Sequence, residues 1–240
     1  MNSADMKQKI TISTLSLILL IVAACMTCTA AFAQTVKPFK EGERAVFLGN
    51  SITDGGHYHS YIWLYYMTRF PDMPIRVFNG GIGGDTAYDM NKRLDGDIFA
   101  MKPSVLMVTF GMNDSGYFEY NGDKPKEFGE QKYQESVKNY QQMEKRFKDL
   151  PDTRIVMVGT SPYDETVQLK ENTPFKTKNE TIKRLVEYQK ESAAKNGWEF
   201  TDLNAPMVAL NQQFQQKDST FTLCGNDRIH PDNDGHMVMA

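Results

Sequence analysis

Short apolar runs alternate with longer amphipathic segments along this chain, and that alternation constrains its fold more than any other feature. Several of the short runs are continuously apolar, which is typical of strands buried on both faces of a sheet. Strands that alternate with helices favour a parallel sheet. The segments predicted as strands are Ala45–Leu48, Ile75–Phe78, Val105–Phe110, Ile155–Gly159 and Trp198–Thr201.

The longer segments have the apolar spacing of helices that cover such a sheet. In one of them, Ile182, Leu185, Val186 and Ala193 share a helical face, and Asn196-Gly197 then stops the helix. The sequence therefore predicts an α/β fold, a three-layer α/β/α sandwich with a five-stranded parallel sheet. The segments predicted as helices are Tyr58–Phe70, Ala87–Ala100, Tyr133–Lys148, Thr181–Lys195 and Pro206–Gln216.

The first 33 residues have the pattern of a secretory signal peptide, so we expect one domain over residues 34–240. Lys7 and Lys9 precede an apolar stretch, and Ala31-Phe32-Ala33 supplies the small residues that a signal peptidase recognises. The apolar core Leu15–Ala24 is short for a membrane-spanning helix. We therefore expect an exported protein, periplasmic or extracellular, without stable membrane insertion after the leader is removed.

Two other interpretations of the leader remain open. One is a retained membrane anchor. The other is a lipid anchor on Cys25, because Val22-Ala23-Ala24-Cys25 resembles a bacterial lipobox. Removal of the leader at residue 33 leaves Cys224 as the one cysteine, so an internal disulfide is excluded for that mature chain.

The charge balance argues against nucleic acid as a partner. The formal net charge is -3, and a protein that binds nucleic acid usually presents a basic face. Oligomeric state has no signal in the sequence.

Residues that could take part in catalysis or ligand binding follow the first three predicted strands, where an open α/β sheet binds its ligands. Ser51 follows the first strand, and a helix N-cap is its alternative role. Four glycines lie in Gly80–Gly84 after the second strand, where backbone amides can approach an anion. A phosphate-binding loop is disfavoured because the Gly-Lys-Ser/Thr ending is missing. Asn113 follows the third strand and could donate to an oxyanion or serve as a turn residue.

Asp227 and His230 form the fourth candidate block, in Asp227-Arg228-Ile229-His230-Pro231. A spacing of three on a turn lets the carboxylate reach the imidazole Nδ1–H, which leaves Nε2 as a base. A solvated surface loop is the alternative. His57 and His59, which follow Ser51 closely, are rival candidates for the base.

Taken together, these four blocks resemble the signature blocks of the SGNH hydrolases, also called GDSL-like lipases and acylhydrolases. The Gly-Asp-Ser-Leu block of that family corresponds to Gly49-Asn50-Ser51-Ile52, with Asn50 and Ile52 as departures, and its second-block glycine corresponds to Gly84. The Gly-x-Asn-Asp and Asp-x-x-His-Pro blocks are matched at residues 111–114 and 227–231. The sequence stops at Ala240 inside the expected closing helix, so we expect a domain truncated there.

The resemblance implies a flavodoxin-like fold and a serine esterase that works without a metal or a cofactor. Ser51 would be the nucleophile, His230 the base and Asp227 its partner. The oxyanion hole would consist of the Ser51 and Gly84 amides and the Asn113 side chain. Asn50, Tyr117 and Phe118 are further candidates for contact with the substrate, although Tyr117 and Phe118 could instead pack their own loop onto the domain.

Three functions stay open from the sequence. The preferred hypothesis is deacetylation of a carbohydrate, with a small ester or an acetylated saccharide as substrate, because aromatic rings can stack on sugars. A lipase or lysophospholipase is the alternative. A glycan-binding protein without catalysis is the third, and the joint presence of all the motif residues argues against it.

Overall fold

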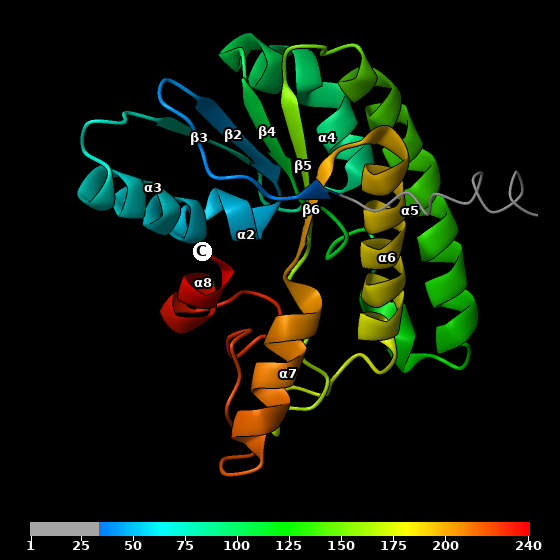
Figure 1. Ribbon diagram of the computed structural model, residues 1–240. Helices are drawn as coiled ribbons and strands as arrows, with labels where there is room; N and C mark the ends of the chain where they lie inside the picture. The colour runs from blue at the N-terminus through cyan, green and yellow to red at the C-terminus, as the bar shows by residue number, and fades with distance from the viewer. Residues whose placement is uncertain (1–33) are drawn as a thin grey trace, which may run out of the picture. The chain divides into compact units, whose positions relative to one another are not determined.

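A parallel sheet lies at the centre of the computed structural model, which describes residues 34–240 (Figure 1). Its strand order is β1-β6-β5-β4-β2-β3, and every neighbouring pair is parallel. The five predicted strands are all present, and the two-residue strand β1 adds an edge to β6 that was too short to predict. The strands are β1 Gln34–Thr35, β2 Arg44–Gly49, β3 Arg76–Gly81, β4 Val105–Val108, β5 Arg154–Gly159 and β6 Glu199–Asp202.

Each helix predicted from the sequence is present, with shifted ends. The helix α5 starts eight residues before its predicted start, because Pro125 is well suited to a first helical turn and the polar residues after it carry no apolar period. The predicted segment Ala87–Ala100 changes its winding after Arg93, first to a π-helix and then to a 3₁₀-helix. The α-helices are α2 Ser51–Asp54, α3 His57–Arg69, α4 Ala87–Arg93, α5 Pro125–Lys148, α6 Lys178–Asn196, α7 Asn204–Gln215 and α8 Asn233–Met239. The remaining helical turns are η1 Leu94–Ile98, η2 Phe99–Met101 and η3 Phe118–Asn121.

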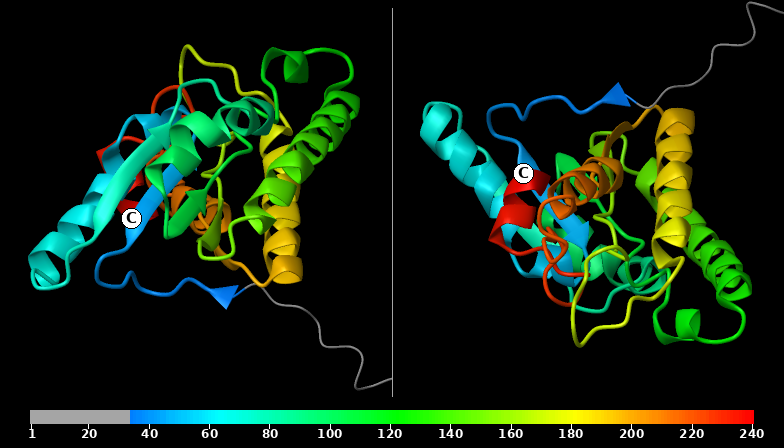
Figure 2. Two further views of the ribbon diagram at one scale, coloured as in Figure 1. Left: turned by 90° about the horizontal axis from the view of Figure 1, so that it is seen from above. Right: turned by 90° about the horizontal axis from the view of Figure 1, so that it is seen from below.

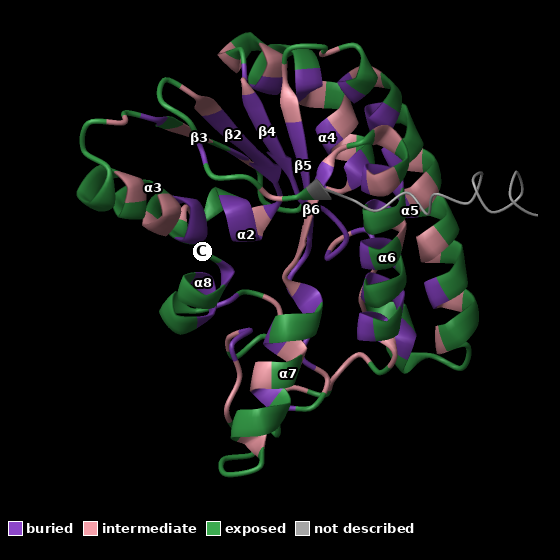
Figure 3. Ribbon diagram, viewed as in Figure 1, coloured by how far each residue is buried: buried purple, intermediate pink, exposed green. Residues whose placement is uncertain are grey.

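Helices lie on both sides of the sheet (Figure 2), which separates two apolar cores as expected for a three-layer sandwich. Alternate residues of one strand enter different cores: Phe47 belongs to the core under α3 and α8, and Leu48 to the core under α4 and α5. Both faces of β2, β4 and β5 are buried, while the outward faces of the helices are exposed (Figure 3). This explains why these three strands appear in the sequence as continuous apolar runs.

The predicted functional blocks follow the carboxyl ends of three adjacent strands. Ser51 comes two residues after β2, Gly84 three residues after β3, and Asn113 five residues after β4. The pairing of β2 with both β3 and β4 brings these three blocks to one edge of the sheet. The predicted leader, residues 1–33 with Cys25, lies outside the described residues. Within residues 34–240, we find no helix with the length and apolarity that a bilayer crossing requires.

Helix α8 is held against α3 by a buried histidine. The His236 ring stacks on the His57 ring at a centroid distance of 4.9 Å and lies parallel to the Tyr58 ring at 6.1 Å. Its Nδ1 has no hydrogen-bond partner among the described residues. Burial, together with the nearby His57, lowers the pKa of His236 to about 4. The neutral imidazole is therefore part of the folded structure.

We expect this histidine to make the fold acid-sensitive. A histidine in the unfolded chain has a pKa near 6.5, so between about pH 6.5 and 4 the unfolded state binds more protons and stability falls as the pH is lowered. The variant His236→Phe keeps an aromatic ring but cannot be protonated. Thermal unfolding of both proteins from pH 7.5 to 4.5 should give a smaller loss of Tm in the variant. Equal losses would assign the acid sensitivity to other groups.

Candidate active site

Ser51 is presented by a tight turn between β2 and α2. Gly49 ends the strand, and a Cβ at this position would lie 2.0 Å from Thr53 Oγ1, so the turn requires glycine. The Asn50 side chain accepts a hydrogen bond from the Ile52 N–H at 3.1 Å and caps the helix. Ser51 is thus the first residue of α2, and its Oγ lies 2.8 Å from His230 Nε2.

Asp227 holds the other side of the His230 ring. Its Oδ2 lies 2.5 Å from His230 Nδ1, and its Oδ1 accepts the backbone N–H groups of Ile229 and His230 at 2.9 Å each. Burial favours the neutral acid, but these hydrogen bonds outweigh it, and the pKa of Asp227 is lowered. The hydrogen bond that Asp227 accepts from the His230 ring raises the pKa of His230, against a smaller opposing effect of burial. The serine from one predicted block and the aspartate and histidine from another therefore form one hydrogen-bonded series.

The turn that carries Asp227 and His230 depends on Arg228, which the sequence analysis did not single out. Arg228 has a left-handed backbone (φ 68°) and is 1% exposed. Its guanidinium donates to the carbonyl oxygens of Asp164, Val167 and Asn172 at 3.1, 2.8 and 2.6 Å. The acceptors lie in a different part of the chain, so no local sequence signal reveals this role.

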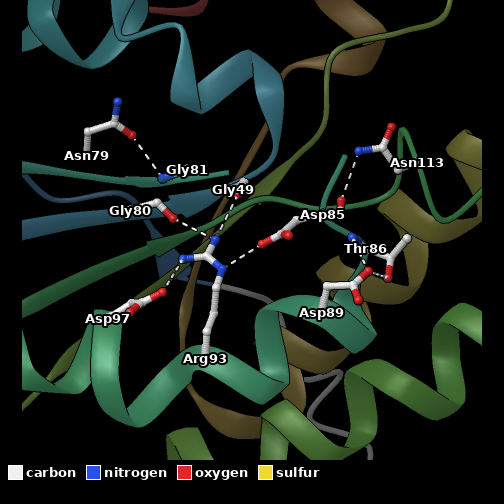
Figure 4. Close-up of polar contacts among 10 residues, drawn as sticks. All are labelled: Gly49, Asn79, Gly80, Gly81, Asp85, Thr86, Asp89, Arg93, Asp97 and Asn113. Carbon is white, nitrogen blue, oxygen red and sulfur yellow. Dashed lines mark hydrogen bonds and ion pairs between the residues drawn. The ribbon is translucent and has the colours of Figure 1, made fainter. Parts of the chain in front are cut away.

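Asn113 has a defined amide orientation. Its Nδ2 donates to the Asp85 carbonyl oxygen at 2.9 Å (Figure 4), and its Oδ1 accepts from the Tyr117 hydroxyl at 2.5 Å. Since an amide nitrogen carries two hydrogens, one N–H of Asn113 remains for a ligand. Gly84, which precedes Asp85, has φ 85° and is exposed, a conformation that favours glycine.

Two buried charged groups hold the segment around Asn113. The Asp114 carboxylate accepts from the Ala87 and Gly111 N–H groups and from Ser136 Oγ, which joins the turn to α4 and α5. Burial raises the pKa of Asp114. Sequence reasoning could have noted this residue, since it belongs to the Gly-x-Asn-Asp block.

Lys178 is the second of these groups, and nothing in its local sequence marks it. Its ammonium, fully buried at the start of α6, donates to the Met112 carbonyl, Ser115 Oγ and the Gly116 carbonyl at 2.8, 2.6 and 2.5 Å. It also lies 3.9 Å from the centre of the Tyr117 ring. Burial lowers the pKa of Lys178 to about 7.

The three predicted substrate contacts have different positions. Asn50 is 1% exposed and occupied as a helix cap, so a direct substrate contact by its side chain does not agree with this structure. Tyr117 is partly buried and bonded to Asn113. Phe118 is 79% exposed and packs edge-on against Phe175 at 5.6 Å.

The rival histidines have other partners. His59 is buried with its Nε2 3.2 Å from the Thr53 carbonyl oxygen, and His57 stacks on His236. Over residues 34–240, no three His, Cys, Asp or Glu side chains are grouped so that they could hold a metal ion.

The arrangement has the parts needed for acyl transfer. The Ser51 hydroxyl is within hydrogen-bond distance of the His230 imidazole, which in turn contacts the Asp227 carboxylate. The Asn113 amide, which follows a neighbouring strand, supplies a hydrogen-bond donor. This geometry suits attack of a serine on an ester carbonyl, with the imidazole as general base.

Known proteins share both the sequence pattern and the fold. Residues 47–238 match the model of the GDSL-like lipase/acylhydrolase family. An acetylxylan esterase from Geobacillus stearothermophilus is 26% identical over 215 residues, which are 83% of this chain and 91% of that protein. A crystal structure of an acetylxylan esterase from that organism, 24% identical, has a TM-score of 0.64 and covers 84% of this chain and 92% of its own.

A further solved structure is more similar in sequence. It is described as a gut microbial diltiazem-metabolizing enzyme, and it is 85% identical with a TM-score of 0.85. The match covers 86% of this chain and 47% of the solved chain, so this chain spans about half of that relative's length. With the family match over most of its residues, the chain belongs to the GDSL-like lipase/acylhydrolase family of carboxylic ester hydrolases.

Proposed function

We propose that this protein is an exported serine esterase that removes acetyl groups from carbohydrates through an acyl-enzyme. One observation carries the catalytic part of the proposal: Ser51 Oγ, His230 and Asp227 are joined by contacts of 2.8 and 2.5 Å beside the segments of Gly84 and Asn113. Export is proposed from the leader pattern of residues 1–33 alone.

In the first half of the reaction, His230 Nε2 takes the Ser51 proton while Oγ attacks the carbonyl carbon. Asp227 keeps the proton on Nδ1 and stabilises the imidazolium that forms. The oxyanion receives hydrogen bonds from the Ser51 and Gly84 amides and from Asn113 Nδ2. Each such donor contributes roughly 10²–10³ in rate.

This tetrahedral intermediate collapses, and the alcohol leaves with the proton held by His230, which completes the first half. In the second half, water attacks the acetyl carbonyl carbon on Ser51 while His230 accepts a proton from it. The second tetrahedral intermediate collapses by breaking its bond to Oγ, acetate is released, and His230 returns the proton to the serine oxygen. In this mechanism the protein supplies the nucleophile, the base and the oxyanion donors.

One relative supports the acetyl group as the acyl unit that is removed, because it is named as an acetylxylan esterase. The alcohol part of an acetylated polysaccharide consists of sugar rings. The exposed ring of Phe118, which directly follows the Asn113 partner Tyr117, offers a surface on which such a ring could stack.

A lipase-type acylhydrolase is the second candidate, and it requires an apolar site for a long acyl chain. An apolar cavity among the described residues has a volume of about 510 Å³ and lies between α3, α8 and the sheet. Its walls include Phe39, Tyr66 and Met107 but none of Ser51, His230 or Asn113. The acetyl esterase is therefore favoured over the lipase.

Acyl chain length tests the proposed activity directly. We expect turnover of p-nitrophenyl acetate to exceed that of the octanoate, because Ser51 does not line the apolar cavity of about 510 Å³ found within residues 34–240. The variant Ser51→Ala should lose roughly 10³–10⁶ of kcat on the acetate. Preference for octanoate would favour the lipase, and equal activity of Ser51→Ala would exclude Ser51 as the nucleophile.

The pH profile tests the role of His230 as a base. The base must be neutral, and its hydrogen bond with Asp227 raises its pKa above the ordinary 6.5, so kcat/KM should fall as the pH drops through a value above 6.5. Asp227→Asn removes the carboxylate that stabilises the imidazolium. That variant should lose roughly 10²–10⁴ in kcat and shift its acid limb to lower pH. Asp218→Asn, a change at an exposed carboxylate, is the matched control, and identical acid limbs in all three proteins would contradict the assignment.

Phe118→Ala tests the contact with the alcohol part of the substrate. We expect kcat/KM to fall roughly 2- to 10-fold on acetylated xylo-oligosaccharides and to stay unchanged on ethyl acetate, which has no ring to stack. Phe70→Ala, at an exposed phenylalanine that follows α3, is the control. A uniform loss on both substrates would remove Phe118 from substrate recognition.

A further inference from the structure

One arginine that the sequence analysis did not assign to the site lies beside the ends of β2 and β3, which carry the site residues. Arg93, the last residue of α4, is partly enclosed, with 13% of its side chain exposed. Its Nε donates to Asp85 Oδ2 at 2.6 Å, and its Nη2 donates to the carbonyl oxygens of Gly80 and Gly49 at 2.8 and 3.3 Å (Figure 4). Its Nη1 lies 3.7 Å from the Asp97 carboxylate.

These contacts connect one guanidinium directly to the segments of Ser51 and Gly84, and indirectly, through Asp85, to Asn113. Gly49 precedes Ser51 by two residues, and Asp85 directly follows Gly84. The carbonyl oxygen of Asp85 accepts the hydrogen bond that orients Asn113 (Figure 4). A displacement of Arg93 would therefore be transmitted to each donor through one or two residues.

The surroundings of Arg93 keep its position fixed. Thr86 and Asp89 form a capping box at the start of α4, with Thr86 Oγ1 donating to Asp89 Oδ2 at 2.7 Å. This cap sets the distance along the helix between Asp85 and Arg93. A planar guanidinium can bond a carboxylate and two carbonyls at fixed angles, whereas a lysine ammonium acts as a point charge.

We propose that Arg93 is a positioning residue that sets the relative placement of the Ser51, Gly84 and Asn113 donors. This role rests on the proposed esterase function. It differs from a purely structural role in its kinetic signature. The donors bind charge that develops only in the transition state, so their displacement lowers kcat and leaves KM nearly unchanged.

The experiment compares Arg93→Met and Arg93→Lys with the wild type on p-nitrophenyl acetate. We expect kcat to fall roughly 10- to 100-fold in Arg93→Met, with KM within about twofold, and the inhibition constant of a trifluoromethyl ketone to rise by the same factor as kcat falls. The kcat of Arg93→Lys should fall between those of the wild type and Arg93→Met, because lysine keeps the positive charge and lacks the planar guanidinium donors.

Arg146→Lys is the matched control. Arg146 also bridges helices, with bonds to the Asn91 carbonyl and to Asp95 at 2.6 and 2.5 Å, but it bonds to none of the oxyanion segments. Its variant should lower Tm and keep kcat. Asp85→Asn removes the charge that pairs with Arg93 and should lower kcat, and it carries the test if Arg93→Met does not fold.

The outcomes separate the two proposals. Folded Arg93 and Asp85 variants that match Arg146→Lys in kcat, or that lose activity through KM alone, would overturn the role of Arg93. A wild-type protein without esterase activity would instead refute the proposed function, and this role with it.

Discussion

Close approach of the chain at the carboxyl edge of the sheet is the constraint on which the site depends. A Cβ at Gly81 would lie 2.2 Å from the Asp54 backbone nitrogen, and a Cβ at Gly80 would lie 2.7 Å from Ile98 Cδ1. Together with Gly49, these positions let β2, β3 and α2 meet without side chains between them. The space that remains admits the Arg93 guanidinium, whose bonds to Gly49 and Gly80 replace the missing side-chain packing by hydrogen bonds.

Most of the fold follows from local pattern, and the differences have local causes. The continuous apolar runs identified β2, β4 and β5 because burial on both faces removes the polar alternation. The predicted third strand extended to Phe110, although β4 ends at Val108, since Phe110 stays buried against Tyr140 after the ladder has stopped. The edge strand β1 has only two residues, and its pairing with β6 is a long-range contact that no local pattern contains.

Some contacts of the candidate site could likewise be predicted from the sequence, and others could not. The contact of Asp227 with His230 could be predicted because a spacing of three on one turn brings the two side chains together. The contact of His230 with Ser51 followed from the resemblance to a family and not from spacing, since 179 positions separate His230 from Ser51. Arg93, Lys178 and Arg228 were missed because their partners are mostly backbone carbonyls, which leave no trace in the residue types along the chain.

The anchoring of Arg228 has a consequence for how such a protein can change. Its acceptors are the backbone oxygens of Asp164, Val167 and Asn172, and every amino acid provides that atom. The exposed side chains of this connection, such as Lys170 and Glu171, can therefore be replaced without removing the anchor of the catalytic turn. Evolution or a designer can vary these exposed positions one at a time while the reaction centre keeps its geometry.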